Sequence, residues 1–394
     1  MGSSQSTPPQ LHPNNDTPVL SLSQLLLRLE GQENNDDVGI VADHDTVWHD
    51  IEILLRKEPE QAAMYCHFVD ASPLQIALRR RQVPPPVSSV RAFLHAYEDA
   101  IHHSDSVGNT AVHTCVDGTE GVQDALTLLL STNSGLASHG NRKGRLPLHM
   151  DIREFEIAEI LLRHYPDGVR HRDYGGETPL HCALTREDVP VNVLRVLLNQ
   201  ETVRVRNKRG STPIDCLGQK LDAMIQSSDS QHLLDDHWHL FEDMIQMVAN
   251  DEPKLHTIIS LACPEHVVLH SLERFPDDAS RRDSLGRTPL HMAASLSSHS
   301  SSCYTILAHL IQLYPEAARM TDNEGRLAID LAAEHGHSGD VMELLVLAEP
   351  RAVDTRDLRD KFYPFLAAAL NANVSTTYHL LRAKPHVISY FNFN

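Results

Sequence analysis

The stretch Arg282-Asp-Ser-Leu-Gly-Arg-Thr-Pro-Leu-His-Met-Ala-Ala-Ser295 combines a tight turn with the start of a helix. Asp283 and Gly286 supply turn chemistry, because glycine adopts a positive φ angle without strain from a Cβ atom. Thr288 suits the N-cap, where its hydroxyl group can accept a hydrogen bond from a free backbone amide. Pro289 suits the first helical position, where a missing N–H costs nothing. The stretch therefore predicts a turn followed by a helix that begins at Pro289.

Segments related to Thr288-Pro-Leu-His291 recur along most of the chain, with first residues separated by 32 to 41 positions. They are Ser72-Pro-Leu-Gln75, Thr110-Ala-Val-His113, Leu146-Pro-Leu-His149, Thr178-Pro-Leu-His181, Thr212-Pro-Ile-Asp215, Pro253-Lys-Leu-His256, Leu327-Ala-Ile-Asp330 and Tyr363-Pro-Phe-Leu366. A second apolar segment follows each of them. A period of this length predicts a helical solenoid, in which each unit is a helix, a loop, a second helix and an extended turn.

Two of these segments carry a family resemblance: Gly176-Glu-Thr-Pro-Leu-His-Cys-Ala-Leu184 and Gly286-Arg-Thr-Pro-Leu-His-Met-Ala-Ala294. On these motifs the chain resembles ankyrin-repeat proteins from Thr46 to Val387, and in particular the large ankyrin families of diatoms and related algae. The resemblance implies an all-α solenoid of about nine stacked helix pairs, with β-hairpin fingers projecting from them. It also implies that the fourth-position histidine is structural and bonds with the neighbouring threonine and backbone.

The sequence predicts four parts. Residues 1–45 form a disordered acidic segment with a short amphipathic helix at Ser21–Leu29, which either docks a partner or folds back over the end of the array. Residues 46–217 form a first stack of repeats, and residues 256–394 form a second stack with a C-terminal cap. Between them, residues 218–255 form an irregular repeat with a polar insertion at Ser227–His237, where the array bends or divides.

Composition limits the classes of function. The formal net charge of −19 argues against nucleic-acid binding, which depends on basic surface. Six cysteines without a CxxC pair indicate a reduced intracellular protein, expected in the cytoplasm. No apolar run approaches the roughly 18 residues of a membrane span, and no secretory signal is visible. We expect a monomer in the cytoplasm, with nuclear and peripheral membrane locations left open.

The N-terminal sequence Met1-Gly2-Ser3-Ser4-Gln5-Ser6 fits the myristoylation pattern. The alternative function is therefore an adaptor that associates with membranes when Gly2 is acylated. The following residues are acidic rather than basic, so a single acyl chain would bind weakly.

Catalytic and metal motifs are not found, so we expect a non-enzymatic protein without cofactor or metal. A metal-binding or enzymatic role is the third alternative. Histidines of the recurring segment are assigned to structure. His266 and His270 stand four residues apart, but two ligands are too few for a zinc site. The glycine-containing segment Gly135–Gly140 lacks the Gly-Lys-Ser/Thr ending of a phosphate loop.

Basic residues concentrate in the predicted fingers despite the acidic total. The predicted partner-binding residues are Arg172, Tyr174, Arg206, Lys208, Arg282 and Ser284. Arginine binds carboxylate or phosphate through two parallel hydrogen bonds, so the expected partner is an acidic or phosphorylated protein segment. Ordinary solvated charge on hairpins is the alternative interpretation. The leading hypothesis is a scaffold or adaptor that binds this partner through fingers and first helices.

Overall fold

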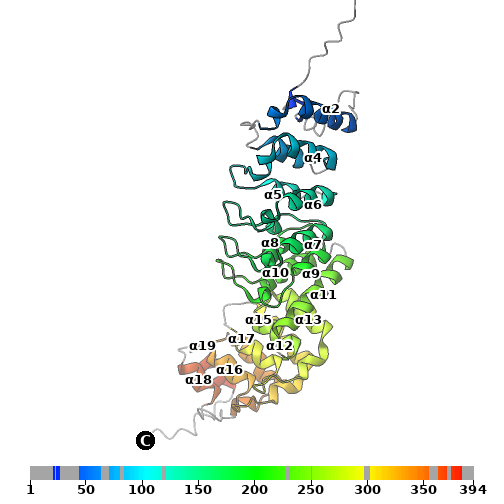
Figure 1. Ribbon diagram of the computed structural model, residues 1–394. Coiled ribbons are helices and arrows are strands. Elements are labelled where there is room, and N and C mark those ends of the chain that lie inside the picture. The colour runs from blue at the N-terminus through cyan, green and yellow to red at the C-terminus, as the bar shows by residue number, and fades with distance from the viewer. Residues whose placement is uncertain are drawn as a thin grey trace, which may run out of the picture. The chain divides into compact units, whose positions relative to one another are not determined.

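The computed structural model describes residues 21–22, 24–26, 44–63, 71–79, 84–117, 121–227, 231–249, 251–296, 302–354, 363–370 and 374–383. These residues form short helices joined by turns (Figure 1). The predicted all-α class is confirmed. The expected β-hairpins are not, because the described residues contain no β-strand; an isolated bridge joins Ser104 and Thr110. None of the described helices has the length and apolar character that crossing a bilayer requires.

Two compact units divide the chain, Met1–Gly168 and Val169–Asn394. The predicted limits of the irregular repeat, 218 and 255, both lie inside the second unit. The predicted division into stacks stays a prediction.

The first unit consists of helix pairs followed by 3₁₀ turns. Its elements are α2 (His44–Lys57), η1 (Pro59–Ala63), α3 (Pro73–Leu78), α4 (Val87–Ala96), η2 (Glu98–His102), α5 (Ala111–Val116), α6 (Gln123–Thr132), η3 (Ser134–Ser138), η4 (Pro147–His149) and α7 (Phe155–His164), with η5 (Pro166–Arg170) at its end. The first helix of one pair packs on that of the next, as α3 does on α5. The second helices also pack on one another in order, α4 on α6 and α6 on α7.

The second unit repeats this arrangement. Its elements are α8 (Pro179–Leu184), α9 (Val191–Leu197), η6 (Thr202–Arg204), α10 (Pro213–Ser227), α11 (Gln231–Val248), α12 (Lys254–Ser260), α13 (Glu265–Arg274), η7 (Pro276–Ser280), α14 (Pro289–Ala294), α15 (Ser302–Leu313), η8 (Pro315–Arg319), α16 (Ala328–Glu334), α17 (Gly339–Ala348), η9 (Ala352–Asp354), α18 (Pro364–Leu370) and α19 (Val374–Ala383). Helices α12, α14, α16 and α18 contact one another in order, and so do α13, α15, α17 and α19.

Short first helices are buried on every side. All six residues of α14, from Pro289 to Ala294, are buried, and so are all six of α8. Small side chains such as Ala293 and Ala294 let neighbouring helices approach closely, whereas the longer second helices are amphipathic and bury one face. Stacking therefore buries a continuous aliphatic core that one pair of helices could not form alone.

The short N-terminal helix lies against the first unit. Leu22, Leu25 and Leu26 are buried, and the Leu22 backbone amide donates to Oε1 of Gln61 at 2.7 Å. Of the two interpretations of this helix, the structure supports the one in which it covers the end of the array. The predicted disorder before it lies outside the described residues. The last repeat, which the sequence predicts to be the C-terminal cap, is described through α18 and α19, and its final residues 384–394 lie outside the described part.

The segment predicted as a polar insertion between two helices is itself partly helical. α10 has 15 residues and α11 has 18, and residues 231–237 of the insertion are the first turns of α11. Leu234, Trp238, Phe241 and Ile245 follow helical spacing, and the last three are fully buried. Burial of Trp238 and Phe241 stabilises the helix, so polar neighbours did not prevent helix formation.

Candidate protein-binding surface

Each finger is a four-residue turn held by its first side chain. In the turn that begins at Asp173, Oδ1 accepts from the backbone amides of Gly175 (2.8 Å) and Glu177 (2.9 Å). The amide of Gly176 donates to the Asp173 carbonyl at 2.9 Å. The same pattern begins at Asp105, Asn141, Asn207, Asp283 and Asp322. The aspartate or asparagine side chain therefore closes the turn without a strand ladder, which explains the missing β-hairpins.

Consecutive turns are joined to one another. The amide of Lys208 donates to the carbonyl of Gly175 at 2.8 Å, and the amide of Asn323 donates to that of Leu285 at 3.0 Å. Gly176 has a φ of 76°, and a Cβ atom there would lie 3.3 Å from the Lys208 nitrogen. Glycine is required at this position because it accepts the left-handed conformation and the close approach of the next turn. Neighbouring turn tips are therefore held at a fixed spacing.

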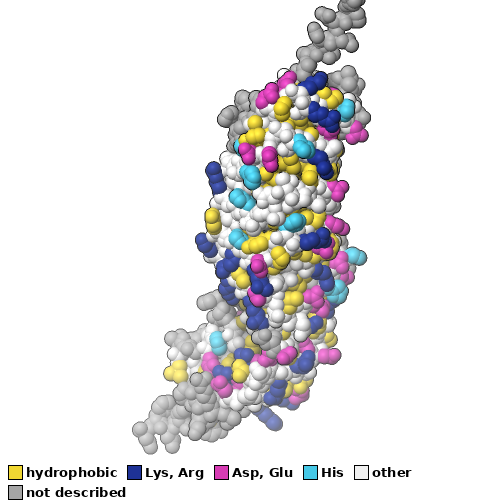
Figure 2. Space-filling view, viewed as in Figure 1, with side chains coloured by type: hydrophobic (Ala, Val, Ile, Leu, Met, Phe, Trp, Pro, Cys, Tyr) yellow, Lys and Arg dark blue, Asp and Glu magenta, His cyan; other side chains and the backbone are white. Residues whose placement is uncertain are grey.

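The structure brings four of the six predicted partner-binding residues together in the second unit. Arg172, Tyr174, Arg206 and Lys208 lie on the two joined turns, and the Arg172 guanidinium donates to the Arg206 carbonyl at 2.7 Å. We call these four residues, with Arg209, the basic turn surface. All five are exposed, and Tyr174 reaches 68% exposure. In Figure 2, Lys and Arg side chains gather on the side of this unit where the turns project.

Charges on this surface have no acidic partner. Among the described residues, none of Arg172, Arg206, Lys208 and Arg209 forms an ion pair. Two guanidinium groups have structural contacts as well. Arg172 donates to the carbonyls of Arg206 and Gly176, and Arg206 donates to that of Gly210 at 2.6 Å. Lys208 and Arg209 have no such side-chain contact in the described residues, so their charges are available to a ligand.

Arg282 and Ser284 have a different setting. Both are exposed, but the Ser284 amide donates to the Glu252 carboxylate at 3.2 Å, and the Ser284 carbonyl accepts from the Asn323 side chain. The negative charge of Glu252 would repel the acidic ligand that the sequence predicts for this turn. The contacts therefore do not join this pair to the basic turn surface. Gly2, the predicted acylation site, lies outside the described residues.

Histidines of the recurring segment hold the helix starts. Nδ1 of His181 accepts from the Thr178 amide (3.2 Å) and hydroxyl (2.8 Å), and Nε2 donates to the Ser211 carbonyl (3.2 Å). His113 and His291 make the same set of bonds. Burial lowers the pKa of all three, that of His113 to about 4, so they are neutral at physiological pH. The predicted structural role of these histidines is confirmed.

Cysteines and acidic clusters in the described residues show no reactive arrangement. Burial raises the pKa of Cys115 and Cys263 to about 12 and that of Cys303 to about 11, which makes their thiolates scarce at neutral pH. Asp173, Glu177 and Cys182 place ligand atoms within 4.8 Å of one another, and no ion is present there. Asp173 already accepts two backbone hydrogen bonds within its turn, which accounts for its orientation.

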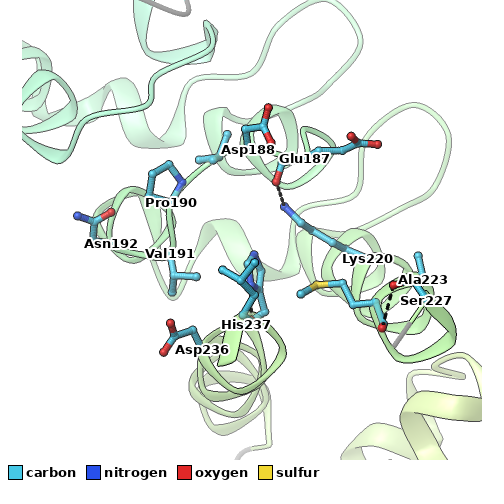
Figure 3. Close-up of a pocket in the computed structure, with 13 residues that line it drawn as sticks. Glu187, Asp188, Pro190, Val191, Asn192, Lys220, Ala223, Ser227, Asp236 and His237 are labelled. Atoms are coloured by element: carbon cyan, nitrogen blue, oxygen red, sulfur yellow. Dashed lines mark hydrogen bonds between the residues drawn. The ribbon is translucent and has the colours of Figure 1, made fainter. Parts of the chain in front are cut away.

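Sequence reasoning missed a groove in the second unit. It lies between the α8–α9 loop and the ends of α10 and α11, with a volume of about 1050 Å³ (Figure 3). Lys220, Leu233, Asp236 and His237 are among its lining residues. The helical spacing of Leu234 and Trp238 was the available signal, but the polar composition of residues 227–237 predicts an insertion between the helices.

Comparison with known proteins gives no assignment: a scan of protein-family models found no match, and neither did a search of curated proteins. The ankyrin resemblance therefore depends on the recurring motif of this chain.

Proposed function

We propose that this chain is a non-enzymatic scaffold of the ankyrin-repeat type, with about nine units, that binds an acidic or phosphorylated segment of a protein partner. The observation that carries the proposal is the pair of joined turns that bear the basic turn surface. Hydrogen bonds from Lys208 to Gly175 and from Arg172 to Arg206 fix the two turns before any ligand arrives. A preformed surface loses little conformational entropy on binding.

The composition of the basic turn surface supports this partner class. Four cations project from two adjacent turns of a chain whose net charge is −19, and Tyr174 stands among them as an exposed aromatic anchor. Arginine and lysine together suit carboxylate or phosphate groups. The use of the buried histidines in helix starts and the high thiol pKa values favour binding over catalysis.

The test uses two fluorescein-labelled 12-residue peptides, one with three glutamates and one with three phosphoserines at the same positions. Binding is measured by fluorescence anisotropy against salt concentration. The variant Lys208→Glu/Arg209→Glu should weaken binding about tenfold or more and flatten its salt dependence. Comparison of the two peptides shows which anion is preferred.

Matched controls separate binding from folding. Lys143→Glu carries a charge reversal on a turn of the first unit and should leave both affinities unchanged. Arg172→Glu and Arg206→Glu also weaken binding, but they remove turn contacts, so their melting temperatures must be compared with the native protein. If the variant binds each peptide as tightly as the native protein does, the basic turn surface is not the binding site.

A further inference from the structure

The groove in the second unit arises from the length of α10 and α11. They have 15 and 18 residues, whereas the preceding pair α8 and α9 have six and seven. The added turns therefore extend past their neighbours. Toward α13 they are held by a contact of 2.9 Å between Asp222 Oδ1 and His266 Nδ1. Toward the α8–α9 loop, residues 185–190, they leave the groove of about 1050 Å³ open.

The floor of the groove is apolar. Val191 projects from the start of α9 (Figure 3), and Met224 on α10 and Leu233 on α11 also line the groove. Leu233 is 52% exposed. The groove thus offers apolar side chains from three elements to a ligand.

The rim offers hydrogen-bond acceptors. Three carboxylates, those of Glu187, Asp188 and Asp236, and one ammonium group line it. Oδ2 of Asp236 lies 3.3 Å from Nδ1 of His232, which stands one turn earlier on α11. That ammonium, Lys220 Nζ, already donates to the carbonyls of Arg186 (2.8 Å) and Glu187 (3.4 Å). It is therefore turned toward the loop backbone, as Figure 3 shows.

His237 adds an independent observation. It is only 5% exposed and lines the groove, and its Nδ1 donates to the Leu233 carbonyl at 2.8 Å. Because Nδ1 carries the hydrogen, Nε2 of the neutral ring is an acceptor, and it has no hydrogen-bond partner among the described residues. A buried polar atom without a partner is uncommon in folded proteins. This ring therefore calls for a donor.

We propose that the groove binds an amphipathic helical segment of a protein partner, with an apolar side chain between Met224 and Leu233 and lysine or arginine side chains against Glu187, Asp188 and Asp236. Charge complementarity selects this occupant, because three carboxylates and one ammonium group line the rim. This surface has the opposite charge preference to the basic turn surface. The two proposals are independent, and each can fail without the other.

The experiment uses a fluorescein-labelled 14-residue peptide of leucine and lysine with leucines at helical spacing, and measures fluorescence anisotropy with the full chain. The variant Glu187→Lys/Asp188→Lys/Asp236→Lys should weaken binding at least tenfold. Its control, Glu156→Lys/Asp167→Lys/Asp277→Lys, makes the same change in net charge at exposed positions elsewhere and should change affinity less than twofold. Met224→Ser/Leu233→Ser should weaken binding about tenfold.

A scrambled peptide of the same composition tests the helical face, and it should bind at least tenfold more weakly than the patterned peptide. Equal weakening by the two lysine variants, or equal affinity of the two peptides, shows general attraction to an acidic protein and overturns the proposal. Absence of binding by the native protein also overturns it. Analytical ultracentrifugation of the native chain and of the Leu233→Ser variant tests whether a second copy of the chain occupies the groove. A native dimer that the substitution dissociates would replace the proposed partner.

Discussion

His113 donates a hydrogen bond from Nε2 to the carbonyl oxygen of Arg145 at 2.9 Å, across 32 positions of sequence. Arg145 directly precedes the helix start of the next repeat. His291 makes the same bond to Arg326, and Gln75 makes it through its amide to Asn109 at 2.7 Å. In each of these three repeats, one side chain thus holds its own helix start and joins it to the following turn.

Replacement of His113 by glutamine should keep these bonds and remove a source of acid sensitivity. Gln75 shows that the amide fits, since its Oε1 accepts from the Ser72 amide while its Nε2 donates onward. Burial lowers the pKa of His113 to about 4, below its ordinary value of about 6.5. The unfolded chain therefore binds more protons between these values, and stability is lost as pH falls through this window.

We expect His113→Gln to be within about 1 kcal/mol of the native protein at pH 7.5 and more stable than it by about 2 kcal/mol at pH 5. Urea denaturation followed by circular dichroism across this range measures the difference. His49→Gln, at an exposed position of α2, is the control and should leave the pH profile unchanged. Parallel profiles for the native and His113→Gln proteins would contradict the assigned role.

Gly286→Ala should destabilise the second unit through two effects. Gly286 has a φ of 74°, where alanine costs about 1–2 kcal/mol, and a Cβ atom would contact the side chain and backbone of Asn323. Gly210 provides the control: its φ is 86°, but nothing lies within 4 Å of an added Cβ atom. Gly210→Ala should therefore lower the free energy of unfolding only by the conformational cost. Gly286→Ala should lower it further, because the contact with Asn323 adds to that cost. Thermal melts of both variants decide this, and equal losses would show that the contact is unimportant.

Ala262→Gly should stabilise the protein. Ala262 follows the last turn of α12 with a φ of 51°, in the left-handed conformation that usually takes glycine at this position. Relief of strain, less the added freedom of the unfolded chain, predicts a gain of about 0.5–1 kcal/mol. Gly336, which follows α16 with a φ of 72°, offers the reverse experiment. Gly336→Ala should lower the melting temperature as Ala262→Gly raises it.

Local chemistry made much of this fold predictable from the sequence. Asp283 and Gly286 predicted a turn, and Thr288 with Pro289 predicted a helix start, because each position depends on contacts within a few residues. The extension of α11 was not predictable in this way, since burial of Trp238 against other elements outweighs the polar sequence around it. The contact of Ser284 with Glu252 was not predictable either, because Glu252 lies in the preceding repeat, 32 positions earlier in the sequence.

The candidate site was predictable to the same extent. Composition and repeat register placed Arg172, Tyr174, Arg206 and Lys208 on successive turns, and the structure joins those turns. The hydrogen bond from Arg172 to the Arg206 carbonyl was not foreseeable, because it depends on the side-chain conformation of Arg172. Because Arg172 and Arg206 also hold the turns, substitutions of Lys208 and Arg209 test binding more cleanly than substitutions of Arg172 and Arg206.

Asp322→Asn should separate the backbone and ionic roles of the turn aspartates. Oδ1 of Asp322 accepts from the amides of Glu324 and Arg326, and Oδ2 accepts from the Arg326 guanidinium at 2.9–3.0 Å. Asn207 holds the equivalent turn with an amide, so asparagine should preserve the backbone bonds. Loss of the ion pair should lower stability by about 1–2 kcal/mol at pH 7, measured by urea denaturation.

Acid should abolish this difference. Burial alone would raise the pKa of Asp322, but hydrogen bonds from the Arg326 backbone and side chain, with the charge of its guanidinium, hold it below its ordinary value. The stabilisation is therefore complete above the unfolded pKa of about 3.9 and is lost as pH falls through the lower folded value. A double-mutant cycle with Arg326→Ala isolates the pair. A coupling energy near zero at pH 7, or one unchanged at pH 2.5, would show that Asp322 acts through its backbone contacts alone.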